Sequence, residues 1–519
     1  MNSSRTHIFL LITIIFIAAI LIFSNLGDRL LWQDEAETAL LARSISIHHI
    51  PVAWDGKNID TGQSGTEFDN NFVWHWSAWG SIYLAYLGSR IFGETPLGFR
   101  IHSAVFGLLT IIAAYFASKR WTGNRRVALF STFLLLLCIP FLLYSRQCRY
   151  YSVISFLGVV ALWSYAGIPR RVPLITFIIS SASMAYFNEL SMGLLLTFVM
   201  VYAFISDEDR RRWKWVFLAM PFITLLMIPQ FIQRLHGGGK AQGWHALNAP
   251  IFGIRLLKGY FEWNNVVFPA IALALLWLSR RMLSLPTKKL LMFMTSSFII
   301  YPFVVAFFLD PNIHYATFAF VMAAILAASA LSDLYKQKRI VTIIAAAVFF
   351  GTNLFAIGPI VWLGKWFPSE RVMYLREISS HYRGPTEATV DFFNSHAREG
   401  EVVATDYEQL PLMLHTKLAV ANVMPKERAL AMGLPRYTYD PFETNWVVPK
   451  MTRCVDCPGF DSKQFLQELE ERGARLTPFP LNVADLKYGN SPTLTYHAFV
   501  SPPPADNQIT VYKIDWPKK

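Results

Sequence analysis

The chain has 519 residues, of which 54% are hydrophobic, 15% aromatic and only 16% charged. This composition excludes an ordinary soluble domain and is typical of a protein that crosses a membrane several times. The net charge of +12 belongs to the first 364 residues, because the remainder contains 18 Lys and Arg against 19 Asp and Glu. Cytoplasmic loops of a membrane protein explain this surplus, so it does not indicate a nucleic-acid partner.

The first apolar segment, Ile8 to Phe23, follows a short N-terminus that carries Arg5. No small-residue cleavage site follows it, so we predict a retained helix with a cytoplasmic N-terminus. Ten more apolar segments are long enough to approach or cross a hydrocarbon core of about 30 Å, which predicts about eleven transmembrane helices. They lie at 101–118, 127–144, 151–167, 173–187, 189–206, 215–233, 264–279, 290–309, 315–331 and 340–362.

Basic clusters occur at every second junction between these segments, around 119–126, 170–171, 210–214, 280–289 and 336–339. The positive-inside rule places all of them in the cytoplasm. The other junctions then face outward, namely 24–100, 145–150, 188–189, 234–263, 310–314 and the tail after about residue 363. The apolar stretch Trp76 to Phe92 would reverse this pattern if it crossed the membrane, so we predict an interfacial or re-entrant helix there.

The chain divides into a membrane module, 1–363, and a polar C-terminal segment, 364–519. The C-terminal segment contains no stretch that is long and apolar enough to cross a membrane. We predict a small soluble domain of mixed α/β structure on the outer face. Its predicted elements are a helix at Thr386–His396, a strand at Glu401–Thr405, a helix at Phe465–Arg472 and a strand at Gln508–Ile514.

Three features that could suggest a metal, redox or phosphate site have simpler interpretations. Cys138 and Cys148 lie in or beside apolar stretches, where free thiols act as small hydrophobic groups. Cys454 and Cys457 form a single CxxC, for which a local disulfide is a better interpretation than zinc binding or redox catalysis. The stretch 237–240, GGGK, lacks the spacing of a phosphate loop and its Ser or Thr, so we reject that function.

The stretch DEAETALLAR places Asp34, Glu35 and Glu37 directly after the first membrane helix. One interpretation is a helix N-cap at Asp34 with Glu37 completing a capping box. The other is that Asp34 or Glu35 accepts a proton from an attacking hydroxyl, since partial desolvation raises the pKa of a carboxylate. The two interpretations are compatible, because one acid can cap the helix while the other faces a cleft.

Two other outward turns carry candidate anion-binding groups. In YSRQCRYY, Arg146 and Arg149 interrupt two apolar segments. Arginines at helix ends often only reach toward the interface, but two of them facing a carboxylate loop also fit a bound phosphate. In DPNIHY, Asp310 fits a helix boundary better than a metal site, while His314 and Tyr315 can donate hydrogen bonds to an anion.

The order and sidedness of these motifs, together with the run GFRIHSAVFGLLT, resemble the integral-membrane GT-C glycosyltransferases. Within them the chain resembles the protein O-mannosyltransferase and lipid A aminoarabinose transferase group, over roughly residues 5–360. The resemblance implies a sugar donor on a polyprenyl phosphate, bound at the outer face, and inversion at the anomeric carbon.

The resemblance also implies roles for individual residues. Asp34 is the expected catalytic base, with Glu35 as its neighbour. The residues expected at the donor phosphate are Arg146, Arg149, His314 and Tyr315. Further candidates for substrate contact are Glu37, His75 and Tyr150. At the re-entrant segment this chain has VWHWS where many members have His-Pro-Pro or Lys-Pro.

We therefore predict an inverting glycosyltransferase of a bacterial inner membrane, with its C-terminal domain in the periplasm. Its partners are a polyprenyl-phosphate sugar, membrane lipid and an envelope lipid, glycan or protein acceptor. A divalent cation between carboxylates and phosphate is compatible with the sequence but not required, and no metal ligand is identified. The alternatives are a transporter or flippase for a polyprenyl-linked lipid, and a non-enzymatic envelope assembly protein.

Overall fold

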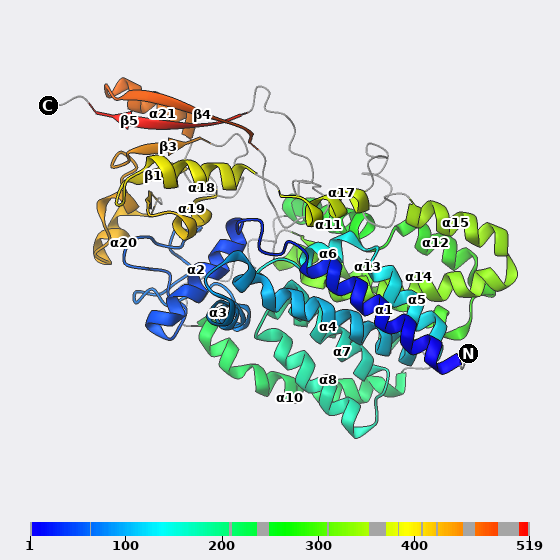
Figure 1. The fold of residues 1–519 in the computed structure, drawn as a ribbon. Coiled ribbons are helices and arrows are strands. Elements are labelled where there is room, and N and C mark those ends of the chain that lie inside the picture. The colour runs from blue at the N-terminus through cyan, green and yellow to red at the C-terminus, as the bar shows by residue number, and fades with distance from the viewer. Residues whose placement is uncertain are drawn as a thin grey trace.

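A helical bundle and a C-terminal sheet domain make up the fold (Figure 1). The computed structural model describes residues 3–62, 64–206, 210–235, 249–308, 311–351, 370–381, 384–405, 408–421, 424–449, 462–485 and 508–516. The long first loop, which we call the outer loop (residues 24–95), joins the bundle to the sheet domain. The predicted fold class, a helical membrane protein with a mixed α/β domain, is confirmed.

The bundle contains helices of very different length. Within the described residues, α1, α4, α10, α13 and α14 are each long and apolar enough to cross a membrane. A sixth crossing is counted if Ile251–Val267 and Ala270–Leu278, which meet at 73°, form one broken span. The bundle helices are α1 (Ser3–Phe23), α4 (Pro96–Thr122), α5 (Arg125–Leu135), α6 (Ile139–Tyr144), α7 (Tyr151–Tyr165), α8 (Arg171–Ala185), α9 (Glu189–Ile205), α10 (Arg210–Leu235), α11 (Ala249–Glu262), η2 (Trp263–Val267), α12 (Ala270–Leu278), η3 (Arg280–Met282), α13 (Leu285–Phe308), η4 (Ile313–Ala316), α14 (Phe318–Gln337) and α15 (Arg339–Gly351).

Local sequence sets the ends of α4, the longest of these helices. The Thr95 side chain caps its start by accepting a hydrogen bond from the Gly98 amide, and Pro96 occupies the first turn. At the other end Gly123 adopts a left-handed conformation, φ +67°, and its amide donates to the Lys119 carbonyl. These caps place Arg100 in the first turns of α4, beside the outer loop.

One expectation about the bundle was wrong in detail, and another was incomplete. The segment 127–144 is not one helix, because α5 ends at Leu135 and α6 begins at Ile139. Pro140 lies at the start of α6, where its missing N–H is tolerated, whereas inside a continuous helix it would remove a hydrogen bond. The junction 234–263, predicted only as an outward connection between apolar segments, contains the helix α11. The predicted segment 340–362 is described only as far as Gly351, and the motif 237–240 and the pair Cys454/Cys457 lie outside the described residues.

The predicted grouping of the junctions into two sets agrees with contacts at both ends of the bundle. At the end with the basic clusters, the Arg120 guanidinium lies 4.5 Å from the Trp163 ring centroid, and Arg212 Nε donates to the Ile168 carbonyl at 3.2 Å. At the opposite end, Arg234 Nε lies 3.2 Å from Glu189 Oε1, linking two junctions predicted to face outward. These junctions therefore share ends as the charge pattern predicts.

The outer loop contains two helices, α2 (Gln33–His48) and α3 (Gly80–Phe92). Helix α3 lies within the stretch predicted as interfacial or re-entrant. Its 13 residues correspond to about 20 Å, which is less than the thickness of a hydrocarbon core. It packs against α2 and α4, and Gly88 and Gly98 allow the close approach, since a Cβ on Gly88 would lie 2.3 Å from the Gly98 carbonyl oxygen.

The C-terminal domain is built on a five-stranded mixed sheet with strand order β2-β1-β3-β5-β4. Strand β1 is parallel to β2 and β3, while β5 is antiparallel to β3 and β4. All four predicted elements occur within two or three residues of their expected bounds. The elements are α17 (Glu370–Ser379), α18 (Pro385–His396), β1 (Val402–Thr405), α19 (Gln409–His415), β2 (Ala419–Ala421), α20 (Lys426–Ala431), η6 (Arg436–Thr438), β3 (Trp446–Val448), α21 (Ser462–Glu471), β4 (Arg475–Ala484) and β5 (Gln508–Asp515).

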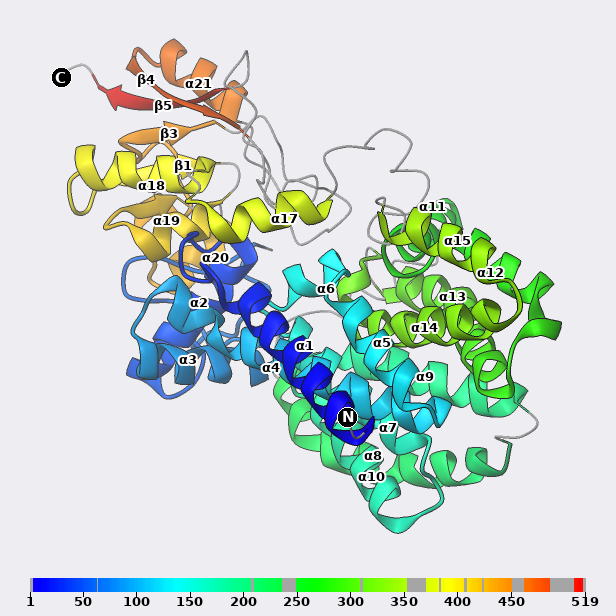
Figure 2. The same ribbon diagram turned by 45° about the vertical axis from the view of Figure 1, so that its right-hand side comes forward.

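The outer loop and the C-terminal domain share one hydrophobic core. Buried side chains from α2, such as Leu41, contact a cluster that includes Val420 of β2 and Trp446 of β3. Helix α17 connects this unit to the bundle, and it lies between the sheet domain and α6 (Figure 2). Tyr374 of α17 is 1% exposed, and its hydroxyl donates to the Leu21 carbonyl near the end of α1 at 2.8 Å. The C-terminal domain is therefore held against the end of the bundle where the candidate site lies.

Candidate functional site

The acidic stretch begins helix α2, and its residues have separate environments. The N-cap is Trp32, whose backbone is extended and whose side chain makes no capping hydrogen bond. The interpretation of Asp34 as the N-cap with Glu37 completing a capping box is therefore wrong, because Asp34 is the second residue inside the helix. Acidic side chains in this first turn interact favourably with the positive end of the helix dipole.

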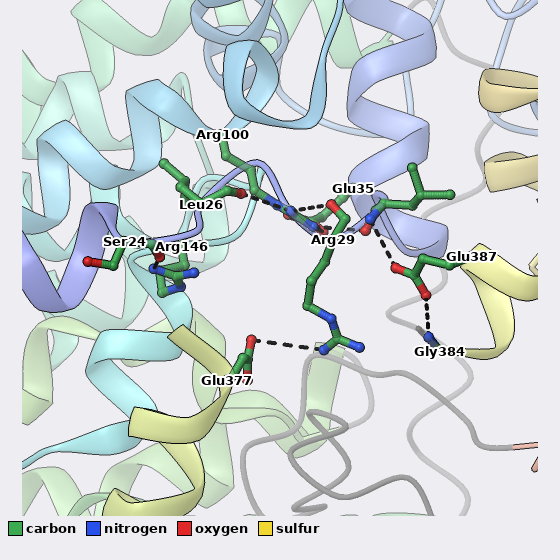
Figure 3. A network of polar contacts seen from close by, with 10 residues as sticks. Ser24, Leu26, Arg29, Glu35, Arg100, Arg146, Glu377, Gly384 and Glu387 are labelled. Atoms are coloured by element: carbon green, nitrogen blue, oxygen red, sulfur yellow. Dashed lines mark hydrogen bonds and ion pairs between the residues drawn. The ribbon is translucent and has the colours of Figure 1, made fainter. Parts of the chain in front are cut away.

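Glu35 is fully buried and is bound on both carboxylate oxygens. Arg100 donates to it twice, from Nε to Oε1 at 2.8 Å and from Nη2 to Oε2 at 2.6 Å. The Cys148 amide also donates to Oε1, at 2.6 Å. The same guanidinium donates to the carbonyls of Leu26, Arg29 and Leu30 in the connection between α1 and α2 (Figure 3). Glu35 thus ties α2, α4 and the turn before α7 together.

Arg149 lies on another side of α2, where a single guanidinium nitrogen contacts three oxygens. Its Nη1 donates to the Asp34 carbonyl at 2.8 Å, to Glu37 Oε1 at 2.9 Å and to Thr38 Oγ1 at 3.0 Å. Asp34 and Glu37 are partly exposed, unlike Glu35. The turn between α6 and α7 therefore brings a positive charge to the acidic helix start, as the sequence predicts.

Aromatic rings continue this arrangement toward α14. The His314 ring in η4 stacks on Tyr151 with centroids 4.9 Å apart, and it meets Tyr150 edge-on at 6.0 Å and Tyr315 at 4.1 Å. Burial lowers the pKa of His314 well below its ordinary value, and the positive charge of Arg149 lowers this pKa further. His314 is therefore neutral at physiological pH, so it can act as a hydrogen-bond partner of an anion but not as a fixed charge.

Six of the nine predicted site residues form one group, and three lie outside it, namely Glu35, Arg146 and His75. Contacts link Asp34, Glu37, Arg149, Tyr150, His314 and Tyr315, and we call this set the acidic-aromatic cluster. Arg146 faces away from it and donates from Nη1 to the carbonyls of Ile22 and Ser24, each at 2.7 Å. His75 lies elsewhere in the outer loop, with Nδ1 2.7 Å from the Gln233 carbonyl oxygen.

A small cavity of about 60 Å³ lies on the Arg146 side of the turn, between the bundle and the C-terminal domain. Its charged lining is Arg29, Glu35, Arg100, Arg146, Glu377 and Glu387. Sequence reasoning did not select Arg29, Arg100, Glu377 or Glu387. Arg100 had a detectable signal, because a charged residue near the start of an apolar helix needs a partner. Glu377 and Glu387 had none, because they depend on how the tail docks.

The described acidic, histidine and cysteine side chains do not form a metal site. Across the described ranges, no three His, Cys, Asp or Glu side chains lie close enough to one another to hold a metal ion. Cys138 and Cys148 are buried free thiols, as expected.

Solved structures with the same architecture cover nearly the whole chain. ArnT from Cupriavidus metallidurans bound to undecaprenyl phosphate superposes with a TM-score of 0.55 at 13% identity, over 96% of this chain and 97% of ArnT. The apo form of that ArnT gives 0.54 at 14% identity, over 98% of both chains. The chain has the GT-C fold.

The oligosaccharyltransferase from Archaeoglobus fulgidus shares this GT-C fold with a TM-score of 0.50 at 13% identity, over 86% of this chain and 70% of its own. No protein-family model matches the sequence, and no curated protein matches it. The likeness is therefore one of fold, and it confirms the fold that the order of the sequence motifs predicted.

Proposed function

We propose that this protein transfers a sugar from a polyprenyl phosphate to a hydroxyl acceptor, with inversion, at the outer face of the membrane. The observation that carries the proposal is the contact of Arg149 with the acidic start of α2 next to His314 and its neighbouring tyrosines. The shared fold with an ArnT bound to undecaprenyl phosphate supports a polyprenyl-phosphate donor. The acceptor is an envelope lipid, glycan or protein.

In the proposed reaction Asp34 is the general base. Its carboxylate takes the proton of the acceptor hydroxyl while the acceptor oxygen forms a bond to the anomeric carbon. The bond from that carbon to the phosphate oxygen breaks, and polyprenyl phosphate leaves with the electron pair. The guanidinium of Arg149 stabilises the developing charge, and His314 and Tyr315 contact the phosphate.

The geometry narrows the roles of the other candidates. Glu35 is assigned a positioning role, because both of its oxygens are bound and the side chain is fully buried. Glu37 and Tyr150 remain substrate-contact candidates within the acidic-aromatic cluster. Arg146 and His75 lie outside that cluster, so we assign neither of them to the donor phosphate.

Transfer by purified full-length protein in liposomes tests the proposal. The donors are undecaprenyl-phosphate sugars with a radiolabelled sugar, and the acceptor is an envelope extract. We expect labelled product from wild type, a loss of about 100-fold or more in Asp34→Asn, and full activity in the control Asp391→Asn, an exposed residue of α18. Undiminished transfer by Asp34→Asn would refute the base assignment. Movement of the lipid across the bilayer without any transfer would favour a transporter.

The proposed orientation has a separate test. We propose an integral protein of the bacterial inner membrane with a cytoplasmic N-terminus and a periplasmic C-terminal domain. A reporter fused near residue 122 lies at the end of the bundle with the basic clusters, so it should report the cytoplasm. An external signal from that reporter would overturn the orientation.

A further inference from the structure

The cavity under α17 and α18 is separate from the acidic-aromatic cluster, and its charged lining consists of three arginines and three glutamates. Arg29, which precedes α2, and Arg146, in the turn before α7, both line it (Figure 3). Arg149, three residues after Arg146, turns instead toward Glu37. Of the two arginines in this turn, Arg146 therefore lines the cavity and Arg149 belongs to the acidic-aromatic cluster.

The carboxylates around the cavity are mostly committed to other partners. Glu35 is held by Arg100, whose hydrogen-bonding nitrogens are occupied by Glu35 and by three backbone carbonyls. Glu387 accepts hydrogen bonds from two backbone amides, those of Leu30 and Gly384, both at 3.0 Å. Neither of these carboxylates makes an ion pair with Arg29 or Arg146 among the described contacts. Glu377 is left as the acid that faces them.

Glu377 is a buried carboxylate with poor contacts. Its side chain is 10% exposed, and its Oε1 lies 3.9 Å from Arg29 Nη1, which is beyond hydrogen-bonding distance. Its Oε2 is buried and has no hydrogen-bond partner within the described part of the chain. Burial raises the pKa of Glu377, and the positive charges of Arg29, Arg146 and Arg100 oppose that shift only in part. A carboxylate in this position is poorly compensated, so an anion that meets the arginines more closely would replace it.

The size and chemistry of the cavity favour one class of anion. A volume of about 60 Å³ holds about four water-sized groups, which is enough for a tetrahedral oxyanion. A phosphate presents several oxygens to two guanidinium groups at once and can carry more charge than a carboxylate. The rest of the wall includes Leu26, Leu30 and Leu143, which gives an apolar side to the site.

We propose that this cavity is a second anion site, which takes a phosphate group between Arg29 and Arg146 and in which Glu377 occupies the place of the phosphate. The phosphate is either that of a lipid head group or free phosphate, since both present the same oxyanion. The site goes beyond the transfer reaction, because it uses neither Arg149 nor Asp34. Binding there separates Glu377 from Arg29, which links occupancy to the position of α17 and the C-terminal domain.

Binding of phosphate to full-length variants tests the proposal. All variants carry Asp34→Asn, so that loss of transfer cannot be confused with loss of this site. The first arm measures the binding of radiolabelled inorganic phosphate by equilibrium dialysis of the protein in detergent. The second arm measures the unfolding temperature of the protein in nanodiscs with and without phosphatidic acid. The variants are Glu377→Gln, which keeps the size of the side chain, Arg29→Gln, and the control Arg43→Gln. Arg43 pairs with Glu94 on the same outer loop, away from the cavity.

We expect Glu377→Gln to bind phosphate at least fivefold more tightly and Arg29→Gln at least tenfold more weakly, with Arg43→Gln unchanged. A response in the dialysis arm identifies free phosphate, and a response confined to the nanodiscs identifies a lipid head group. Equal binding by Arg29→Gln and Arg43→Gln in both arms would overturn the proposal, and so would weaker binding by Glu377→Gln. We expect Arg149→Gln to bind phosphate as tightly as the protein with Arg149. Loss of phosphate binding in Arg149→Gln would instead assign the anion to the acidic-aromatic cluster.

Discussion

Arg100 holds both carboxylate oxygens of Glu35, at 2.8 and 2.6 Å, while the adjacent Asp34 side chain remains partly exposed. Two neighbouring acids therefore have opposite environments. Both oxygens of Glu35 already accept hydrogen bonds in a fully buried position, whereas Asp34 lies where a substrate can reach it. This difference is the reason why we propose a structural role for Glu35 and the role of general base for Asp34.

Replacing Glu35 by Gln leaves the buried Arg100 charge without its partner. Removing one member of a buried ion pair commonly costs about 3–5 kcal/mol of unfolding free energy. We expect a clear fall in the unfolding temperature of Glu35→Gln in detergent, and an unchanged temperature in Asp34→Asn. The surface control is Glu94→Gln, which removes the exposed partner of Arg43. A Glu35→Gln protein with normal stability and no transfer would instead make Glu35 a catalytic residue.

Arg149→Lys tests whether the guanidinium shape matters or only its charge. Three oxygens of α2 converge on Arg149 Nη1 within 3.0 Å, and an ammonium on a different stem cannot reproduce that geometry. We expect kcat for transfer to fall about 100-fold. The control is Arg43→Lys, because Arg43 is a partly exposed arginine of α2, and this variant should keep its activity. Normal kcat in Arg149→Lys would show that any positive charge suffices.

Sequence patterns predicted most of what depends on neighbouring residues. The apolar segments, the alternation of basic clusters and the four tail elements are local signals. The described residues contain helices in every predicted apolar segment, although 127–144 is divided between two helices and 340–362 is described only as far as Gly351. The charge pattern also predicted which junctions meet, including those of Arg149 and His314. Pro140 is a local signal for the division of α5 from α6, but the continuous apolar stretch around it predicted a single helix.

The cavity under α17 and the core shared by the outer loop and the C-terminal domain could not be predicted from local patterns, because they depend on contacts between distant parts of the chain. The bond from the Leu30 amide to Glu387 joins residues 357 positions apart, and no periodicity in the sequence specifies that pairing. Likewise Asp34 and Glu35 are adjacent acids in sequence, and only the position of Arg100 in space distinguishes them. Sequence reasoning found the stretch that carries the acids but could not separate their roles.

Asn58 links the outer loop to the C-terminal domain. It is 2% exposed, its Nδ2 donates to the Leu418 carbonyl at 3.2 Å, and its Oδ1 accepts from the Val420 amide at 2.8 Å. Asn58→Ala leaves two backbone groups without partners, at a cost of about 1–3 kcal/mol each. We expect a lower unfolding temperature and faster proteolysis of the C-terminal domain.

The matched control for this substitution is Asn394→Ala. Asn394 is exposed and makes one hydrogen bond, to the His415 carbonyl, within the C-terminal domain. Unchanged proteolysis in Asn58→Ala would mean that the apolar core alone holds the two parts together. A chain cut after residue 363 loses part of that core, so its outer loop should also become sensitive to protease.

Asp60 should make stability depend on pH. It is 4% exposed, and burial, followed by the charges of Glu37 and Glu67, raises its pKa well above 3.8. In the unfolded chain this carboxyl loses its proton near its ordinary pKa, whereas in the folded protein it keeps the proton to higher pH. The folded state therefore binds more protons within that window, so its stability is fully present below the unfolded pKa and falls as pH rises through the folded pKa.

Asp60→Asn removes this dependence, because the amide is neutral at every pH. We expect its unfolding temperature to exceed that of wild type at pH 8 and the difference to shrink toward pH 4, with each unit of pKa shift worth about 1.4 kcal/mol. Thermal unfolding of both proteins across this range measures the effect, and the exposed Asp391→Asn should follow wild type throughout. Parallel curves for wild type and Asp60→Asn would show that Asp60 is ionised in the folded protein and that the charge of Arg149 compensates its burial.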